Sequence, residues 1–322
     1  MDADSVRTFL YEVCIPFILI LCLLAITLNG IILASRCYVH SRSTSLELTY
    51  SLALSDTYTS FVIALSLLTN SYFPVVFDIA PSFCFSLTLE AFRTGGLLTG
   101  VLHITALACV HYLQIKRPFD HTTVFTLKNA HILALVIWIV PPIVLILYFS
   151  MWPGQGYRDP TCQDNSFYNK LPFRAQISSF IMILILITCI VYWLMLLKIG
   201  QVRSKTTGAS SSRSRRTLAT ATLIFGTFLF GWMPASILFL LGAEGMPLYE
   251  NQSLLLNVMA IVSLINIMLK SLTNPVIYAT RIPEIRQFVA KNICLRCFAY
   301  NAAATQRELA PLRSPTTTSS KA

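Results

Sequence analysis

Long apolar segments alternate with short polar ones along most of this chain. A helix needs about 20 mostly apolar residues to cross the hydrocarbon core of a bilayer. The segments that are long and apolar enough lie at 12–35, 46–70, 84–113, 130–150, 174–198, 216–242 and 253–280. The pattern therefore predicts an all-α membrane fold, a bundle of seven transmembrane helices.

Composition excludes an ordinary soluble domain. Of the 322 residues, 55% are hydrophobic and only 12% are charged, with a mean hydropathy of +0.66. The connecting segments are too short for a second folded domain, and no internal repeat of the kind found in inverted-repeat transporters is visible. We expect one transmembrane domain over residues 1–292. The polar, Ser- and Thr-rich segment 293–322 is typical of a disordered cytoplasmic tail.

Lys and Arg are divided unevenly between the two sides of the predicted bundle. With the N-terminus outside, 18 of the 24 lie in cytoplasmic segments, as the positive-inside rule requires. We therefore expect a multi-pass protein of the cell membrane with an extracellular N-terminus. The net charge of +10 is mainly this topology signal, because it is split among short loops and forms no nucleic-acid surface. We also expect no cleavable signal peptide, so that the first span directs its own insertion.

The last predicted span carries a polar stripe. Asn266, Lys270, Asn274 and Tyr278 are each four residues apart and so share one helix face, and Pro275 interrupts the backbone hydrogen bonding between them. A transmembrane helix tolerates proline where its neighbours satisfy the freed carbonyl. Polar and charged residues inside a membrane are costly and usually functional. This face is therefore a candidate functional site.

After this span, apolar and charged residues over 281–289 alternate with helical spacing. This pattern predicts a short amphipathic helix on the inner leaflet. Cys294 and Cys297 follow it, and they are either palmitoylation sites or free thiols.

Three further residues lie on the predicted outer side. Cys84 and Cys162 face the oxidising compartment, where they either form a disulfide or remain unpaired. Asn251 begins the glycosylation sequon Asn-Gln-Ser, whose occupancy its closeness to the seventh span leaves open.

Short motifs in six of the spans occur in an order that resembles the rhodopsin-like (class A) G-protein-coupled receptors. The resemblance covers residues 12 to about 292. The motifs are Asn29-Gly30, Leu52-Ala53-Leu54-Ser55-Asp56, Val110-His111-Tyr112 in the place of Asp-Arg-Tyr, Trp138, Gly231-Trp232-Met233-Pro234, and Asn274-Pro275-Val276-Ile277-Tyr278.

The resemblance implies a receptor that converts binding of an extracellular ligand into a helix rearrangement read by a heterotrimeric G protein. It also implies arrestin and kinases as partners of the tail, membrane lipids around the bundle, no cofactor, and no catalytic or metal-ligating residues. Glu90, Arg93 and Trp232 are the expected ligand-binding residues. Arg93 stands where amine receptors carry an Asp, which argues against a simple amine and leaves an anionic or a lipid-like ligand. Either Arg93 clamps an anion, or Glu90 three residues before it neutralises it.

Several residues are implied to act as activation switches, namely His111, Tyr192, Trp232, Asn274, Pro275 and Tyr278. Tyr192 and Tyr278 are expected to swing inward on activation. His111 replaces the arginine that contacts the G protein, so two outcomes remain. One is coupling with altered efficiency and raised basal activity, and the other is a receptor that does not couple.

In the family, residues in the places of Asp56 and Lys270 help to bind a sodium ion. Here the polar core is expected to comprise Asn29, Asp56, Lys270 and Asn274, and Gly100 stands in the place of a serine ligand. Our hypothesis is that the Lys270 ammonium replaces sodium beside Asp56; the alternative is that Lys270 snorkels elsewhere.

Two other classes of function are weighed against a receptor. An opsin needs a Schiff-base lysine where Met268 stands. A membrane zinc hydrolase needs clustered ligands, whereas the five histidines are scattered. His103 is expected to hydrogen-bond Trp138 in a structural role.

Overall fold

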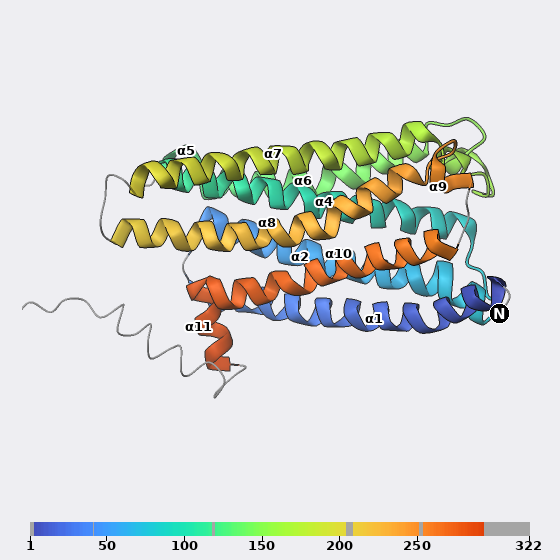
Figure 1. The fold of residues 1–322 in the computed structure, drawn as a ribbon, viewed down its shortest axis with the longest axis horizontal. Coiled ribbons are helices and arrows are strands. Elements are labelled where there is room, and N and C mark those ends of the chain that lie inside the picture. Colours follow the sequence, from blue (N-terminus) through green and yellow to red (C-terminus); the bar gives the residue numbers. More distant parts are fainter. Residues whose placement is uncertain (1–2, 41, 118–119, 204–208, 251–253, 293–322) are drawn as a thin grey trace, which may run out of the picture.

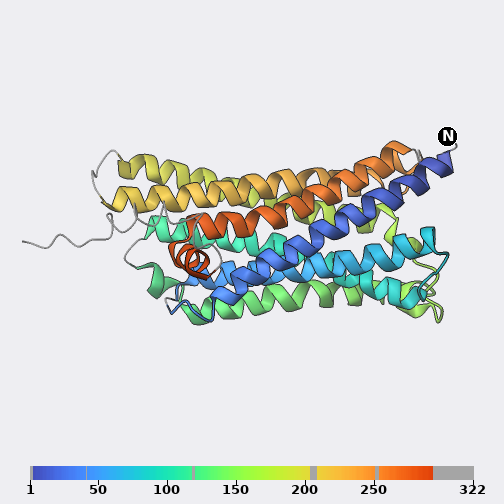
Figure 2. The ribbon, with the colours of Figure 1, turned by 90° about the horizontal axis from the view of Figure 1, so that it is seen from below.

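The computed structural model describes residues 3–40, 42–117, 120–203, 209–250 and 254–292. Seven long helices lie side by side in an elongated bundle (Figures 1 and 2), and the described residues contain no strand. The long helices are α1 (Ala3–Ser35), α2 (Thr44–Leu67), α4 (Phe83–Lys116), α6 (Leu127–Phe149), α7 (Leu171–Arg203), α8 (Ala209–Leu241) and α10 (Leu254–Arg281). The predicted all-α, seven-span fold is confirmed.

Shorter elements join the long helices. They are the π-helix η1 (Leu68–Tyr72), α3 (Phe73–Val76), α5 (His121–Val124), the 3₁₀ turns η2 (Gly156–Arg158) and η3 (Ser166–Tyr168), α9 (Pro247–Glu250) and α11 (Pro283–Asn292). The helix α11 lies across one end of the bundle, and α1 begins at the opposite end (Figure 1). Ile285 of α11 is fully buried, so the predicted short amphipathic helix is present and its apolar face packs on the bundle.

Several helices extend past the predicted spans. The first span was expected to begin at residue 12, but α1 begins at Ala3, and the sixth was expected from 216, but α8 begins at Ala209. Hydropathy marks the part of a helix that suits hydrocarbon, whereas helical backbone continues into the polar flanks. Capping fixes other starts, because the hydroxyls of Ser43 and Ser82 accept backbone N–H groups at the beginnings of α2 and α4.

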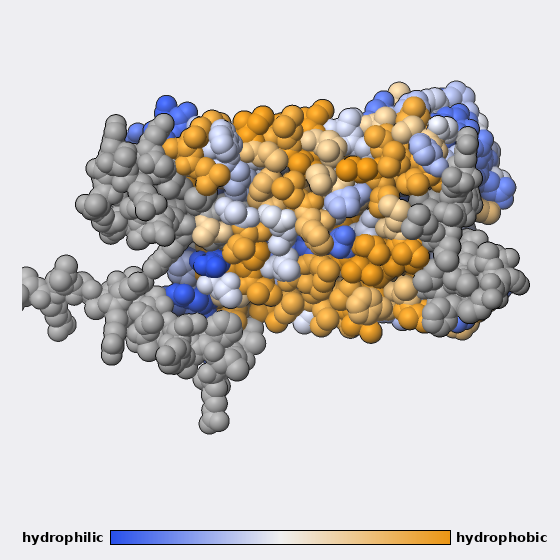
Figure 3. Space-filling view, in the orientation of Figure 1, coloured by the Kyte–Doolittle hydropathy of each residue, from blue (hydrophilic) through white to orange (hydrophobic). Residues whose placement is uncertain are grey.

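The helix α4 lies at the centre of the bundle, where it contacts α2, α6, α7 and α8. The outer face of α6 is, by contrast, a continuous row of exposed aliphatic side chains, including Ile132, Leu135, Ile139, Ile143 and Leu147. Figure 3 shows apolar side chains covering the middle of the bundle and polar ones gathered near its ends. This is the surface that a bilayer requires of a spanning protein.

Candidate functional site: a buried ion pair between α2 and α10

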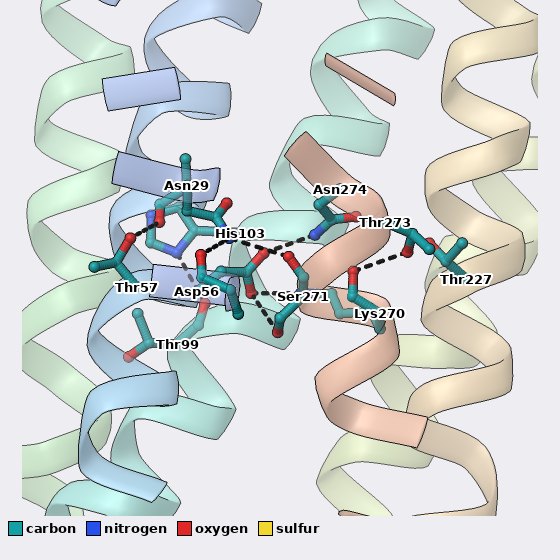
Figure 4. A network of polar contacts seen from close by, with 12 residues as sticks. Asn29, Asp56, Thr57, Thr99, His103, Thr227, Lys270, Ser271, Thr273 and Asn274 are labelled. Atoms are coloured by element: carbon teal, nitrogen blue, oxygen red, sulfur yellow. Dashed lines mark hydrogen bonds and ion pairs between the residues drawn. The ribbon is translucent and has the colours of Figure 1, made fainter. Parts of the chain in front are cut away.

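A carboxylate of α2 and an ammonium group of α10 meet inside the bundle. Lys270 Nζ lies 2.7 Å from Asp56 Oδ1, and Asn274 Nδ2 donates to Asp56 Oδ2 over 2.7 Å. The hydroxyl of Ser271 donates to Asp56 Oδ1 over 3.4 Å. Figure 4 shows these four side chains converging between the two helices. Asp56 is thus held by three donors from consecutive turns of one helix.

The spacing of α10 explains this convergence. Lys270 and Asn274 are one helical turn apart and therefore point to the same side of α10. Asn29 of α1 ties the same turn to a third helix, since its Nδ2 donates to the backbone oxygens of Ala25 at 2.9 Å and Ser271 at 3.0 Å. The sequence predicted Asn29, Asp56, Lys270 and Asn274 as the polar core. It missed Ser271, although Ser271 lies three residues before Asn274 and so close to the same face.

Because Asp56 and Lys270 are buried, leaving either charge without its partner would cost free energy. Asp56 and Lys270 are each 3% exposed, so neither charge is solvated. An isolated charge in such a place is strongly unfavourable, and a hydrogen-bonded partner of opposite sign offsets that cost. Lys270 therefore does not snorkel to the membrane surface.

The same geometry does not fit a bound sodium ion. The ammonium nitrogen already lies against Asp56 Oδ1, at the distance of a direct ion pair. Gly100 offers no hydroxyl, and a Cβ added there would lie 3.7 Å from Ser55 Oγ, in ordinary contact with α2. The lysine ammonium thus occupies the place beside Asp56 Oδ1 that a bound cation would take.

A polar relay lies beside the ion pair on α2, α4 and α6. His103 Nε2 lies 2.8 Å from Ser51 Oγ, Trp138 Nε1 donates to the same oxygen over 3.1 Å, and His103 Nδ1 lies 2.8 Å from Thr99 O. The expected direct hydrogen bond between His103 and Trp138 is therefore wrong. Ser51 stands between the two rings, whose centroids are 6.2 Å apart.

Nearer the N-terminal end of α4, Arg93 forms a salt bridge with a residue of the same helix. Arg93 Nη2 donates to Glu90 Oε1 over 2.6 Å, and Thr94 Oγ1 donates to the same oxygen over 3.3 Å. The hydroxyl of Tyr168, from η3, also donates to Glu90 Oε1. Of the two expectations for Arg93, the pairing with Glu90 is the one present. Tyr168 could not be predicted from the sequence, because it lies on a loop without periodicity.

Two features fix the loop that carries Tyr168. Cys84 and Cys162 form a disulfide, as expected for two cysteines on the same side. Backbone N–H groups, first that of Asp164, hydrogen-bond the Asp159 carboxylate and lower its pKa to about 2. Burial, followed by the nearby charge of Glu90, raises the pKa of Tyr168 above its ordinary range, so its hydroxyl remains a donor at neutral pH.

The remaining switch candidates are buried in the bundle but spread along it. Trp232 of α8 is 4% exposed and belongs to the main apolar core, while His111 of α4 is 8% exposed. The Tyr192 ring of α7 stacks on Phe225 of α8 with a centroid separation of 4.5 Å. Tyr278 is completely buried. Neither the Trp232 indole nitrogen nor the Tyr278 hydroxyl hydrogen-bonds to the ion pair.

Three other predicted sites, Asn251, Cys294 and Cys297, lie outside the described residues. The sequence also missed a second buried carboxylate, Glu47 of α2. It pairs with Arg36 at 2.8 Å and lies 3.4 Å from His131 Nε2 of α6.

Within the described residues, seven helices are long and apolar enough to cross a membrane, and α10 contains Asn-Pro-Val-Ile-Tyr. Together with the polar core between α2 and α10, these features are those of a seven-transmembrane receptor. The family model described as "7 transmembrane receptor (rhodopsin family)" matches residues 28–278. The chain therefore belongs to the rhodopsin family of seven-transmembrane receptors. A comparison with curated proteins finds no match for it.

Proposed function

We propose that this protein transduces an extracellular ligand signal to heterotrimeric G proteins. In this proposal, the Lys270 ammonium takes the place of the sodium ion that other members of the family bind. The observation that carries the proposal is the 2.7 Å contact between Lys270 Nζ and Asp56 Oδ1. It joins α2 to α10 next to Pro275, where a bend is available. A ligand acts by shifting the population between inactive and active bundles, and the ion pair biases that equilibrium.

The proposed topology has the N-terminus outside, so that α11 lies at the cytoplasmic face and the disulfide-bonded loop at the extracellular face. The distribution of Lys and Arg supports this orientation. The domain over 1–292 carries signalling, and the tail over 293–322 is the proposed substrate of kinases and the docking segment for arrestin.

The proposed ligand is anionic or lipid-like and is not a simple amine. Glu90, the nearest carboxylate to Arg93, already accepts hydrogen bonds from Arg93, Thr94 and Tyr168, so it is a poor counter-ion for an ammonium group. Arg93 pairs with Glu90 through Nη2, whereas its buried Nε has no hydrogen-bond partner among the described residues and is a donor for an acidic ligand group. Arg93→Ala therefore separates the two ligand classes. Loss of a charged hydrogen bond worth about 1.5–3 kcal/mol lowers the potency of an acidic agonist roughly 10- to 150-fold and leaves a neutral lipid agonist unaffected.

The opsin alternative receives no support from the position of Lys270. Its nitrogen is engaged by Asp56, and Met268, at the place of the Schiff-base lysine, lies with its sulfur 3.3 Å from Cys22 Sγ. For a hydrolase, no group of three His, Cys, Asp or Glu within the described part of the chain is placed to hold a metal ion. The proposed receptor, unlike an opsin or a hydrolase, carries out no chemical reaction.

The experiment that tests coupling is expression of the full chain with a panel of G-protein reporters, first without ligand, beside His111→Arg. We propose coupling with altered efficiency, so that wild type gives a ligand-independent signal in at least one reporter and the arginine variant changes its size. Silence of both proteins in every reporter, at equal surface expression, would favour a receptor that does not couple.

A further inference from the structure

The helix α8 ends beside the loop between α6 and α7, and one arginine of α7 joins the two. Arg174 Nη1 donates to the backbone oxygen of Phe239 on α8 over 3.3 Å. On the loop, Arg174 Nε donates to the backbone oxygen of Tyr168 over 3.3 Å, and Nη2 donates to Asn169 Oδ1 over 2.8 Å. The guanidinium also lies over the rings of Phe239 and Tyr168, at 4.9 and 5.7 Å from their centroids. We call these contacts the Arg174 clasp.

The clasp engages a carbonyl group that α8 leaves without its own donor. The last carbonyl groups of a helix have no intrahelical partner. The Ala243 N–H, which would continue the α-helix by donating to Phe239 O, donates instead to Leu240 O over 3.0 Å. Arg174 supplies the missing donor, and it places a cation at the C-terminus of α8, where the helix dipole favours positive charge.

A second contact ties the same loop to the end of α8. The Glu244 N–H, just beyond α8, donates to the backbone oxygen of Asn169 over 2.8 Å. Asn169 is therefore held by α7 through its side chain and by the end of α8 through its backbone. Since the preceding residue, Tyr168, donates to Glu90, polar contacts lead from α4 through this loop to the end of α8.

An arginine suits this position because the three acceptors lie on separate segments. Its planar guanidinium presents donors in several directions, whereas a lysine has a single nitrogen and cannot replace all three contacts. Pro234 interrupts the hydrogen bonding of α8, so the segment that follows it can be held while the preceding segment changes direction.

We propose that Arg174 is a positioning residue, which fixes the C-terminal end of α8 to α7 and to the loop between α6 and α7 in the resting receptor. This inference rests on the proposed receptor function. Movement of this end of α8 against α7 breaks the clasp, so the clasp favours the resting bundle. A ligand that displaces the loop releases the end of α8 and shifts the population toward the active bundle.

The first test measures hydrogen exchange in the full-length receptor, purified in detergent, at the Glu244 amide, because its acceptor residue Asn169 is held by Arg174. Arg174→Lys keeps the charge and loses the fork of donors. Exchange at Glu244 should become about tenfold faster, the effect of losing one hydrogen bond to a charged group. Arg158→Lys, the same change at an exposed arginine of the same loop, should leave the exchange as in wild type. Unchanged exchange in Arg174→Lys would overturn the inference.

A second variant loosens the clasp without altering Arg174. A Cβ added at Gly242 would lie 2.7 Å from Arg174 Nη1, so the guanidinium has to leave Phe239 O. Gly242→Ala should therefore speed the exchange, whereas Gly226→Ala should not, because a Cβ added there meets nothing within 4 Å. Against Arg174→Met, Gly242→Ala should add less than it does in wild type. Its other close contact, 3.3 Å to the backbone oxygen of Leu238, is present in both backgrounds and cancels. Equal additions in the two backgrounds would refute the clasp.

Signalling separates a positioning role from a purely structural one. In the G-protein reporters, without ligand and at equal surface expression, Arg174→Lys should raise the signal by a factor of up to about ten. Arg158→Lys should match wild type. Faster exchange with an unchanged signal would reduce Arg174 to a structural residue and overturn the inference. Silence of every protein in every reporter would instead contradict the proposed coupling, and the exchange data would still decide on the clasp, so the two failures are distinguishable.

Discussion

Removal of one partner of the buried ion pair should destabilise the receptor far more than removal of both. At 2.7 Å and an effective dielectric constant of about 20, the attraction between Lys270 and Asp56 is on the order of 6 kcal/mol before desolvation is subtracted. Breaking a buried pair by removing one charge typically costs about 3–5 kcal/mol, since the other charge is left uncompensated. Lys270→Met should fall near the lower end, because Asn274 and Ser271 still donate to the carboxylate.

The assay is a double-mutant cycle built from Lys270→Met, Asp56→Asn and the double variant. Free energies of unfolding are measured by denaturant titration of each protein in mixed micelles without sodium. The double variant should lie within about 1–2 kcal/mol of wild type, because replacing a buried pair by neutral groups of similar volume is often nearly neutral. The coupling energy should therefore reach about 4 kcal/mol or more. Additive effects of the two single changes would refute the reasoning.

Three further outcomes follow from the relay and the outer loop. Ser51→Ala should cost about 1–3 kcal/mol of stability, because two buried ring nitrogens lose their shared oxygen; unchanged melting would contradict this assignment. Tyr168→Phe should speed hydrogen exchange across residues 156–168, since it removes a hydrogen bond to a carboxylate, and unchanged exchange would show that the bond does not hold the loop. Asp159 has a folded pKa below its ordinary value, so its contribution is present above about pH 4 and is lost as pH falls toward 2. Exchange in the loop at neutral pH and at pH 5 should consequently be equal once intrinsic rates are corrected, and faster opening already at pH 5 would argue against this pKa.

The fold could be predicted almost completely from the sequence, because the bilayer imposes one dominant constraint. Apolar length sets the number of spans, whereas the orientation predicted from the charge asymmetry stays a prediction. The first and sixth predicted spans begin later in the chain than α1 and α8 do, because they were located by hydropathy alone. Hydropathy records where hydrocarbon begins, not where helical hydrogen bonding stops.

For the site, some residues could be predicted from the sequence, whereas others could be identified only from the structure. Lys270 and Asn274 were assigned together because a spacing of four determines a common face. Ser51 could not be anticipated, because a small side chain from a third helix separates His103 from Trp138 only when the distances between helices are known.

The measurement that tests the central claim most directly is ligand-independent nucleotide exchange on a G protein in membranes, in sodium chloride and in choline chloride, for wild type and Lys270→Asn. If Lys270 replaces the sodium ion that other members of the family bind, wild-type nucleotide exchange is the same in both salts. Sodium then lowers the nucleotide exchange that the asparagine variant supports. Strong suppression of wild-type exchange by sodium would contradict the claim, because it would show that sodium, rather than the lysine, neutralises Asp56.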